Sequence, residues 1–282
     1  MGQVDIILWM KCNEKCSFCF QDTKYIKKYD VLLDKKDILK LLIKWKKLWL
    51  NMVNISWWEP TIYEDNFNYI LKLSSKLLYR DIKVITNWIQ FSKLDFCNNN
   101  LKYITDIWLS FHSASNKNIQ DKLTWLVWSY DLVIRAIKNI KKLSNINLHN
   151  HCVITNDNID ILEEHIKKII KLWFISIHFM SLMHNTDNNK TQSYDFNKLA
   201  SLLKWIIDKY KNKIIIELSY IQPCYFKWYE KYVQWFEYWK EYISNNVNSL
   251  KSWEKTILSN KYLEKKCINC KYLNECHGFW KK

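Results

Sequence analysis

Apolar residues recur along this chain in two alternating patterns. Short apolar runs alternate with longer segments in which apolar residues return every three or four positions among lysines. The first pattern predicts buried strands, and the second predicts amphipathic helices that cover them. The predicted strands are 6–8, 53–55, 82–86, 104–111, 148–155, 175–180 and 214–218, and two of the predicted helices are 35–47 and 160–172.

This order of elements predicts the fold class. Repeated strand–helix units give a parallel sheet covered by helices, so we expect an α/β protein. With 282 residues, 49% of them hydrophobic, the chain can bury a full core. It contains no run of 18 apolar residues and enters a strand almost at once, so we expect neither a membrane span nor a secretory signal, and a cytoplasmic location.

Three cysteines follow the first apolar run with the spacing C-x3-C-x2-C: Cys12, Cys16 and Cys19. Thiolates are the usual ligands of iron–sulfur clusters. Three of them can hold three irons of a four-iron cluster and leave the fourth iron open to a small molecule. A zinc site that lacks one ligand and three unrelated cysteines are the alternatives.

The segment 5–20, DIILWMKCNEKCSFCF, resembles the opening of the radical S-adenosylmethionine (radical SAM) enzymes. This resemblance implies a partial (β/α)6 TIM-like barrel in which the three cysteines are catalytic and hold a SAM-binding 4Fe–4S cluster. It also implies that Phe18 lies near the adenine of SAM. In that family, one electron cleaves SAM to a 5′-deoxyadenosyl radical, which abstracts hydrogen from a substrate. The implied electron donor is a protein such as a flavodoxin or ferredoxin.

Glycine is scarce and tryptophan is abundant, with 2 glycines and 16 tryptophans in the chain, whereas about 7% glycine is usual. Trp49 and Trp173 fall just after amphipathic helices, where a left-handed conformation favours glycine. Trp88 follows an asparagine at a strand end, and Trp125 and Trp128 punctuate a loop. We interpret most of the tryptophans as glycines of a code that reads UGA as glycine. A genuinely tryptophan-rich protein is the alternative.

With that interpretation, Ser56-Trp57-Trp58-Glu59-Pro60 becomes S-G-G-E-P. This segment resembles the glycine-rich segment that binds the methionine amino group of SAM in radical SAM enzymes. The predicted cofactor-binding residues here are Trp57, Trp58, Glu59 and Pro60. Glycine allows the backbone to approach a ligand closely, whereas two indoles would block that approach. A degenerate barrel that binds SAM or carries electrons without radical chemistry is a further alternative, which real tryptophans at 57 and 58 would favour.

Four polar residues lie near the ends of predicted strands: Asn87, Ser110, His112 and Asn156. Barrels bind their ligands at the carboxyl ends of the strands. We therefore expect these residues to contact the ribose or carboxylate of SAM, or the substrate. Polar residues at strand ends also cap turns, and a single histidine beside a strand can be purely structural.

A second group of cysteines lies after the last predicted barrel strand. Its members are Cys224, Cys267, Cys270 and Cys276. The C-terminal part resembles the twitch or half-SPASM extension of radical SAM enzymes, which encloses an auxiliary 4Fe–4S cluster. Structural zinc is the alternative for four thiolates, and a redox disulfide fits these metal-like spacings less well. We therefore predict a radical SAM core over 1–215 and an auxiliary cluster-binding extension over 216–282.

The formal net charge is +15, and nearly all of the basic residues are lysines. Arg80 and Arg135 are the two arginines, so the side chains best suited to phosphate recognition are scarce. Lysines spread over many helix faces predict a solvated surface rather than a nucleic-acid site. The predicted substrate is a peptide or a small cofactor precursor. A metal-stabilised nucleic-acid-binding or RNA-modifying protein is the alternative function.

Overall fold

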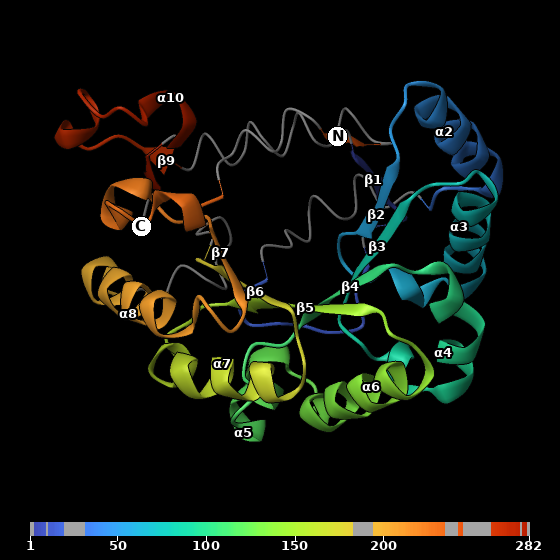
Figure 1. Ribbon diagram of the computed structural model, residues 1–282, viewed down its shortest axis with the longest axis horizontal. Coiled ribbons are helices and arrows are strands. Elements are labelled where there is room, and N and C mark those ends of the chain that lie inside the picture. Colours follow the sequence, from blue (N-terminus) through green and yellow to red (C-terminus); the bar gives the residue numbers. More distant parts are fainter. Residues whose placement is uncertain are drawn as a thin grey trace.

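Seven parallel strands that follow one another in chain order form most of a curved, unclosed sheet in the computed structural model (Figure 1). The structure describes residues 3–9, 11–19, 32–182, 194–234, 242–244, 261–276 and 278–280. The strands are β1 (Gln3–Ile7), β2 (Met52–Ser56), β3 (Asp81–Thr86), β4 (Asp106–Ser110), β5 (Asn147–Val153), β6 (Ser176–Met180) and β7 (Ile215–Ser219). A short strand β8 (Tyr242–Ser244) runs parallel to β1 at its free edge.

Helices cover the convex side of this sheet (Figure 1). They are α2 (Lys35–Lys47), α3 (Glu64–Lys76), α4 (Leu94–Asn100), α5 (Lys117–Thr124), α6 (Ser129–Leu143), α7 (Leu162–Lys171) and α8 (Phe196–Tyr210). Short 3₁₀ helices join them: η1 (Pro60–Ile62), η2 (Gln90–Ser92), η3 (Leu101–Tyr103), η4 (Ile159–Ile161), η5 (Pro223–Phe226) and η6 (Glu230–Tyr232). The predicted α/β class with a partial TIM-like barrel is confirmed.

The alternation of side chains along each strand separates the two faces of the sheet. Ile55, Val84 and Ile107 pair in register across three strands and are fully buried beneath the helices. Burial of each such side chain stabilises the fold by about 1.5–3 kcal/mol. Between them, Lys83 and other polar residues point to the concave face. The sheet therefore offers a polar concave face on a rigid apolar support.

Two predicted strands are shorter in the structure, and side-chain hydrogen bonds lie at the ends where they stop. The predicted strand 104–111 is reduced to β4, and Thr105 Oγ1 accepts the Ile82 N–H at 3.0 Å. The predicted strand 148–155 ends at Val153, where the Asn158 side chain accepts the Thr155 N–H at 2.8 Å. Such local bonds to threonine and asparagine compete with the sheet ladder.

The C-terminal region packs against the β7 end of the arc (Figure 1). Its described elements are β9 (Lys261–Tyr262), η8 (Lys265–Cys267), α10 (Leu273–Cys276) and β10 (Phe279–Trp280). The Tyr272 hydroxyl donates to Glu230 Oε1 at 2.9 Å and joins this region to η6. The division between a core domain and an extension at residue 215 stays a prediction. β7, the last strand of the barrel, continues beyond that residue to Ser219. In the described residues, no helix is both long enough and apolar enough to span a membrane.

The carboxylate of Glu59, which is 0% exposed, ties together the loops that follow β2 and β3. It accepts hydrogen bonds from the Thr61 N–H at 3.0 Å, the Thr86 hydroxyl at 2.9 Å and the Asn87 N–H at 2.6 Å. Its own backbone N–H donates to Lys11 O at 3.2 Å, in the loop that follows β1. Burial raises the pKa of this carboxyl, and the hydrogen bonds from Asn87 and Thr61 act against that rise. The side chain of Glu59 thus joins the loop after β2 to the end of β3, and its backbone holds the cysteine loop beside them.

We expect Glu59→Gln to lower the free energy of unfolding by about 2–4 kcal/mol, because the amide NH2 would face donors that now meet an acceptor. Urea unfolding measures the loss. Glu64→Gln, on the exposed first turn of α3, is the matched control, with an expected loss below about 1 kcal/mol. Equal losses in the two variants would contradict this role of Glu59.

Candidate active site

The loop that carries Cys12, Cys16 and Cys19 follows β1 at the carboxyl edge of the sheet. It is held against the C-terminus of α5, where the Ser17 N–H donates to Leu123 O at 2.9 Å. The Cys19 N–H donates to Cys16 O at 3.0 Å and closes a turn between the two cysteines. The three thiols are close enough for their charges to interact. The structure therefore brings the three predicted ligands together.

The surroundings of these thiols suit a buried cluster of sulfur and iron. Asn87 Nδ2 donates to Cys12 Sγ at 3.6 Å, and the Glu14 N–H donates to it at 3.5 Å. Such N–H donors tune thiolate ligands. Burial raises the pKa of both Cys12 and Cys16, so iron must displace their protons on binding.

Across the described residues, no three His, Cys, Asp or Glu side chains are gathered to hold a single metal ion. In a four-iron cluster each cysteine binds a different iron, which spreads the ligands more widely than a single ion does. The spread of the Cys12 loop is therefore compatible with a cluster.

Glu14 is a buried acid in this loop that the sequence analysis did not single out. Its carboxylate accepts a hydrogen bond from the Cys16 thiol at 3.6 Å. Burial, together with the charge of Glu59, raises the pKa of Glu14 to about 8. No sequence signal could have identified it, because Glu14 stands among polar loop residues and its burial results from tertiary packing.

Phe18 and His112 are in contact, with ring centroids 4.5 Å apart in an edge-on arrangement. His112 Nδ1 accepts the Val153 N–H at 3.1 Å, and the His112 carbonyl accepts Asn158 Nδ2 at 2.9 Å. Burial lowers the pKa of His112 to about 3. The neutral ring of His112 therefore joins the segment after β4 to the end of β5 and contacts the ring of Phe18.

The other polar residues at strand ends have different surroundings. The Asn87 side chain donates to Asn13 Oδ1 at 2.7 Å, so it faces the cysteine loop. Ser110 ends β4, and its carbonyl accepts the Trp88 indole N–H at 2.7 Å. Asn156 is exposed, and the turn after β5 is made by Asn158, which the sequence analysis did not single out.

Trp57 and Trp58 are consecutive left-handed residues, with φ of 73° and 46°. Their ring centroids are 5.7 Å apart. Pro60 is buried and begins η1, where its fixed φ suits the first helical position. Glu59 directly follows Trp58, and its N–H donates to Lys11 O in the cysteine loop. The backbone at 57–58 therefore lies beside that loop.

Left-handed backbone is concentrated at tryptophans throughout the described chain. Ten non-glycine residues have positive φ, and eight of them are tryptophans: Trp49, Trp57, Trp58, Trp88, Trp125, Trp128, Trp173 and Trp228. Trp49 N donates to Lys46 O and Leu50 N donates to Trp45 O, which together form the Schellman motif that ends helices, usually at glycine. The same pair of bonds recurs at Trp125 and Trp173. The left-handed conformation predicted after these helices is confirmed. Leu78 fills the equivalent position after α3.

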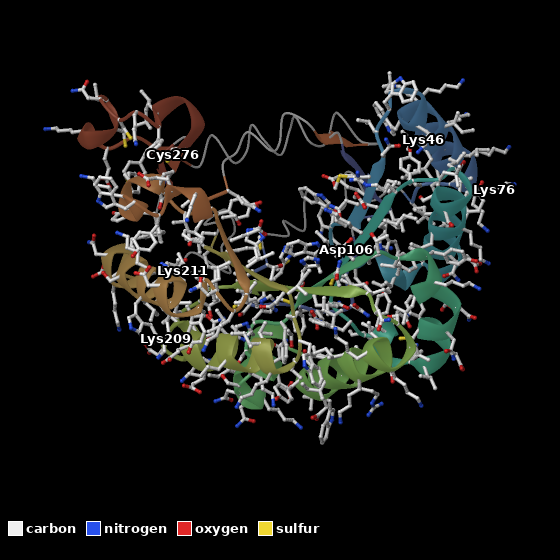
Figure 2. All side chains as sticks on the ribbon, viewed as in Figure 1. Lys46, Lys76, Asp106, Lys209, Lys211 and Cys276 are labelled. Carbon is white, nitrogen blue, oxygen red and sulfur yellow. The ribbon has the colours of Figure 1, made fainter. Side chains whose placement is uncertain are left out.

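The C-terminal cysteines lie on η5, η8 and α10 and between η8 and α10. Cys267 is buried, Cys224 is exposed, and Cys270 N donates to Cys267 O at 3.1 Å. Figure 2 labels Cys276 in this region, across the arc from Lys46 and Lys76. Gly278 has φ +85°, and a Cβ there would lie 2.2 Å from Tyr262 O. Glycine is thus required just after Cys276.

Comparisons with known proteins agree on a family. The model of the Radical SAM superfamily matches residues 6–169. A probable GTP 3′,8-cyclase from Saccharolobus islandicus (strain M.14.25 / Kamchatka #1) is 26% identical over 220 residues, which make up 78% of this chain and 69% of that protein.

Solved structures share the fold. Streptococcus suis SuiB bound to precursor peptide SuiA aligns with 98% of this chain and 71% of its own, with TM-score 0.70 and 18% identity. A second SuiB structure aligns with 74% of this chain and 46% of its own, with TM-score 0.61 and 21% identity. Native anSMEcpe with bound AdoMet and Cp18Cys peptide aligns with 99% of this chain and 89% of its own, with TM-score 0.63 and 14% identity. Because the family model covers more than half of the chain, this protein belongs to the radical SAM superfamily of enzymes.

Proposed function

We propose that this enzyme reductively cleaves SAM at a 4Fe–4S cluster held by Cys12, Cys16 and Cys19. The observation that carries this proposal is the placement of the three thiols in one loop beside the left-handed backbone of residues 57–58. When bound, the reduced cluster supplies one electron that splits SAM into methionine and a 5′-deoxyadenosyl radical, which takes a hydrogen atom from the substrate. A flavodoxin or ferredoxin is the proposed electron donor.

The residues of the chain orient these groups and limit access of water. Asn87 donates to a ligand sulfur, and Phe18, supported by His112, presents a ring for the adenine of SAM. Glu59 fixes the backbone at 57–58, whose carbonyl and N–H groups would receive the methionine amino group and the carboxylate. Ser110 and Asn156 complete the proposed contacts from the ends of β4 and β5.

We also propose that the eight left-handed tryptophans are glycines in the natural protein. Tryptophans are 16 of the 282 residues of the chain, yet within its described part they are eight of the ten non-glycine residues with positive φ. Left-handed backbone costs a bulky residue about 1 kcal/mol or more, whereas glycine adopts it freely. Loss of the indoles at 57 and 58 would also open the proposed SAM site.

Peptide masses of the protein isolated from its natural source test this proposal. We expect glycine at residues 49, 57, 58, 88, 125, 128, 173 and 228, because the backbone at these positions is left-handed. Tryptophan masses at 57, 58 and 88 would overturn the proposal.

The SAM-cleaving activity is tested by 5′-deoxyadenosine formation from SAM in the reduced, cluster-loaded chain with glycine at those eight positions. We expect turnover that Cys16→Ala lowers by at least about 10³-fold, because one iron then loses its ligand. Cys97→Ser is the matched control: Cys97 is remote from the loop and donates to Phe91 O at 3.0 Å, a bond that serine can keep. Equal turnover with and without Cys16 would contradict the assignment.

The substrate is proposed to be a peptide, with a small cofactor precursor as the other possibility. The peptides named in the SuiB and anSMEcpe structures support the first. The 26% identity to GTP 3′,8-cyclases supports a nucleotide substrate as the second candidate. Addition of GTP to the SAM cleavage assay separates them, since a true substrate stimulates 5′-deoxyadenosine formation and is itself converted.

For the region 216–282 we propose a twitch or half-SPASM extension in which Cys224, Cys267, Cys270 and Cys276 hold an auxiliary 4Fe–4S cluster. The support is the C-x2-C-x5-C spacing, followed by the glycine that the backbone requires at 278. Four cysteine ligands would leave no open iron, which suits electron transfer or structure better than SAM activation.

Metal analysis tests the extension. The reconstituted chain is expected to hold about eight irons, and the double variant Cys267→Ser, Cys270→Ser about four, because each four-iron cluster loses its site with its ligands. SAM cleavage by the first cluster is the internal control. About four irons and one zinc in the unchanged chain would establish the zinc alternative instead.

A further inference from the structure

A row of polar residues crosses the concave face of the sheet from β4 to β7. Strand register aligns Ser110 with His151, His151 with His178, and His178 with Glu217. The two histidines lie on the same face as Trp108, whose ring centroid is 4.7 Å from that of His151. Ser110 stands at the carboxyl end of β4, the end at which barrels bind their ligands, and the row runs from there to the middle of β6 and β7.

His151 and His178 form a directly bonded pair. His178 Nδ1 lies 3.3 Å from His151 Nε2, so one ring donates and the other accepts. His178 is 7% exposed, and its Nε2 has no hydrogen-bond partner among the residues that the structure describes. Ser219, further along β7 on the same face, also has a buried hydroxyl that meets no partner in the described part of the chain. Of the nine buried side-chain atoms without a partner among the described residues, these two are the ones that lie on strands, and they share the concave face. Buried polar atoms normally find partners, so this pair of atoms points to a bound polar group.

Two other histidines, His165 and His149, have both ring nitrogens engaged, unlike His178. In His165, Nδ1 accepts the Ala114 N–H at 2.8 Å and Nε2 lies 2.9 Å from Asn150 Oδ1, so both nitrogens are engaged. His149 is likewise engaged by Ser176 at 2.7 Å and Asp106 at 3.0 Å. Those two rings have structural roles, whereas His178 has one nitrogen to offer.

The pair is uncharged at neutral pH. Burial lowers the pKa of His178 to about 4 and that of His151 well below its usual value, to which the nearby His178, His149 and His112 also contribute. A neutral bonded pair has two tautomeric states, so His178 Nε2 either donates or accepts as the ligand requires.

The charges on the concave face disfavour a highly anionic substrate. Among the described strands, Lys83 is the cation on this face, and it shares the face with Asp5, Asp106 and Glu217. Asp106 is labelled on this side in Figure 2, whereas Lys209 and Lys211 lie on or beside the outer helix α8. A nucleoside triphosphate requires several clustered cations, and these strands do not supply them.

The histidine pair adjoins the proposed SAM site. The His112 ring contacts Phe18 in the cysteine loop, and His112 is close enough to His151 to influence its ionisation. We propose that His178, with His151 behind it, binds an uncharged amide or hydroxyl group of the substrate and places it next to SAM. This inference rests on the proposed function and defines its substrate as a neutral polar group such as a peptide amide.

The test uses the full chain with its oxidised clusters and nitrogen-15 in its seven histidines. N-acetylglycinamide serves as the neutral amide probe and GTP as the anionic probe, each at about 10 mM, a range suited to fragment-sized ligands. We expect N-acetylglycinamide to shift the His178 ring-nitrogen resonances and change the tautomer ratio of the pair. GTP should leave them unchanged. His165, with both nitrogens engaged, is the control and should not respond to either probe.

Variants then separate hydrogen bonding from packing. His178→Gln keeps a terminal hydrogen-bonding group and should weaken N-acetylglycinamide binding by less than about tenfold, or about 1.4 kcal/mol. His178→Phe should abolish the response seen at His151. A His178 shift with GTP, no shift with N-acetylglycinamide, or an equal shift at His165 would each overturn the inference. SAM cleavage by the unchanged chain tells the failures apart: cleavage without a His178 response overturns this inference alone, and no cleavage overturns the proposed function.

Discussion

The buried carboxylate of Glu59 is the constraint on which the candidate site depends. A fully desolvated carboxylate is costly unless its oxygens are satisfied, and here Thr61, Thr86 and Asn87 satisfy them. Thr61 follows β2, Thr86 ends β3 and Asn87 follows it, and the backbone N–H of Glu59 reaches the loop after β1. Glu59 therefore fixes the relative positions of the cysteine loop, the left-handed segment and Asn87. Their preorganisation follows from one electrostatic requirement.

Backbone conformation also restricts which residues can form the candidate site. Consecutive left-handed residues at 57 and 58 turn the chain sharply just before Glu59. Such a turn presents backbone groups at close range, which is useful only if side chains do not fill the space. The same conformation closes α2, α5 and α7 through Schellman bonds. Glycine both adopts the left-handed conformation at low cost and leaves space for a ligand. The helix ends and the turn at 57–58 therefore favour the same residue type, for two separate reasons.

The sheet divides its concave face between two kinds of chemistry. Strands β1 to β4 lead into the loops that carry sulfur, Glu59, Asn87 and the Phe18–His112 contact. Strands β5 and β6 supply the neutral imidazoles of His151 and His178. Parallel register places the two regions on the same face of one rigid sheet, so a cofactor and a substrate held by them would meet inside the barrel.

The sequence by itself determined the features that depend on neighbours along the chain. Cysteine spacing, alternating strands and helices, and left-handed positions after helices are local properties, and the structure shows the sheet, the helices and the positive φ as expected. Tertiary structure decided which polar groups are buried together. Glu59 meets Asn87 across 28 residues, and His151 meets His178 across 27. Neither contact has a sequence signature, because each is set by strand register and by the cost of leaving a polar atom unpaired in the interior.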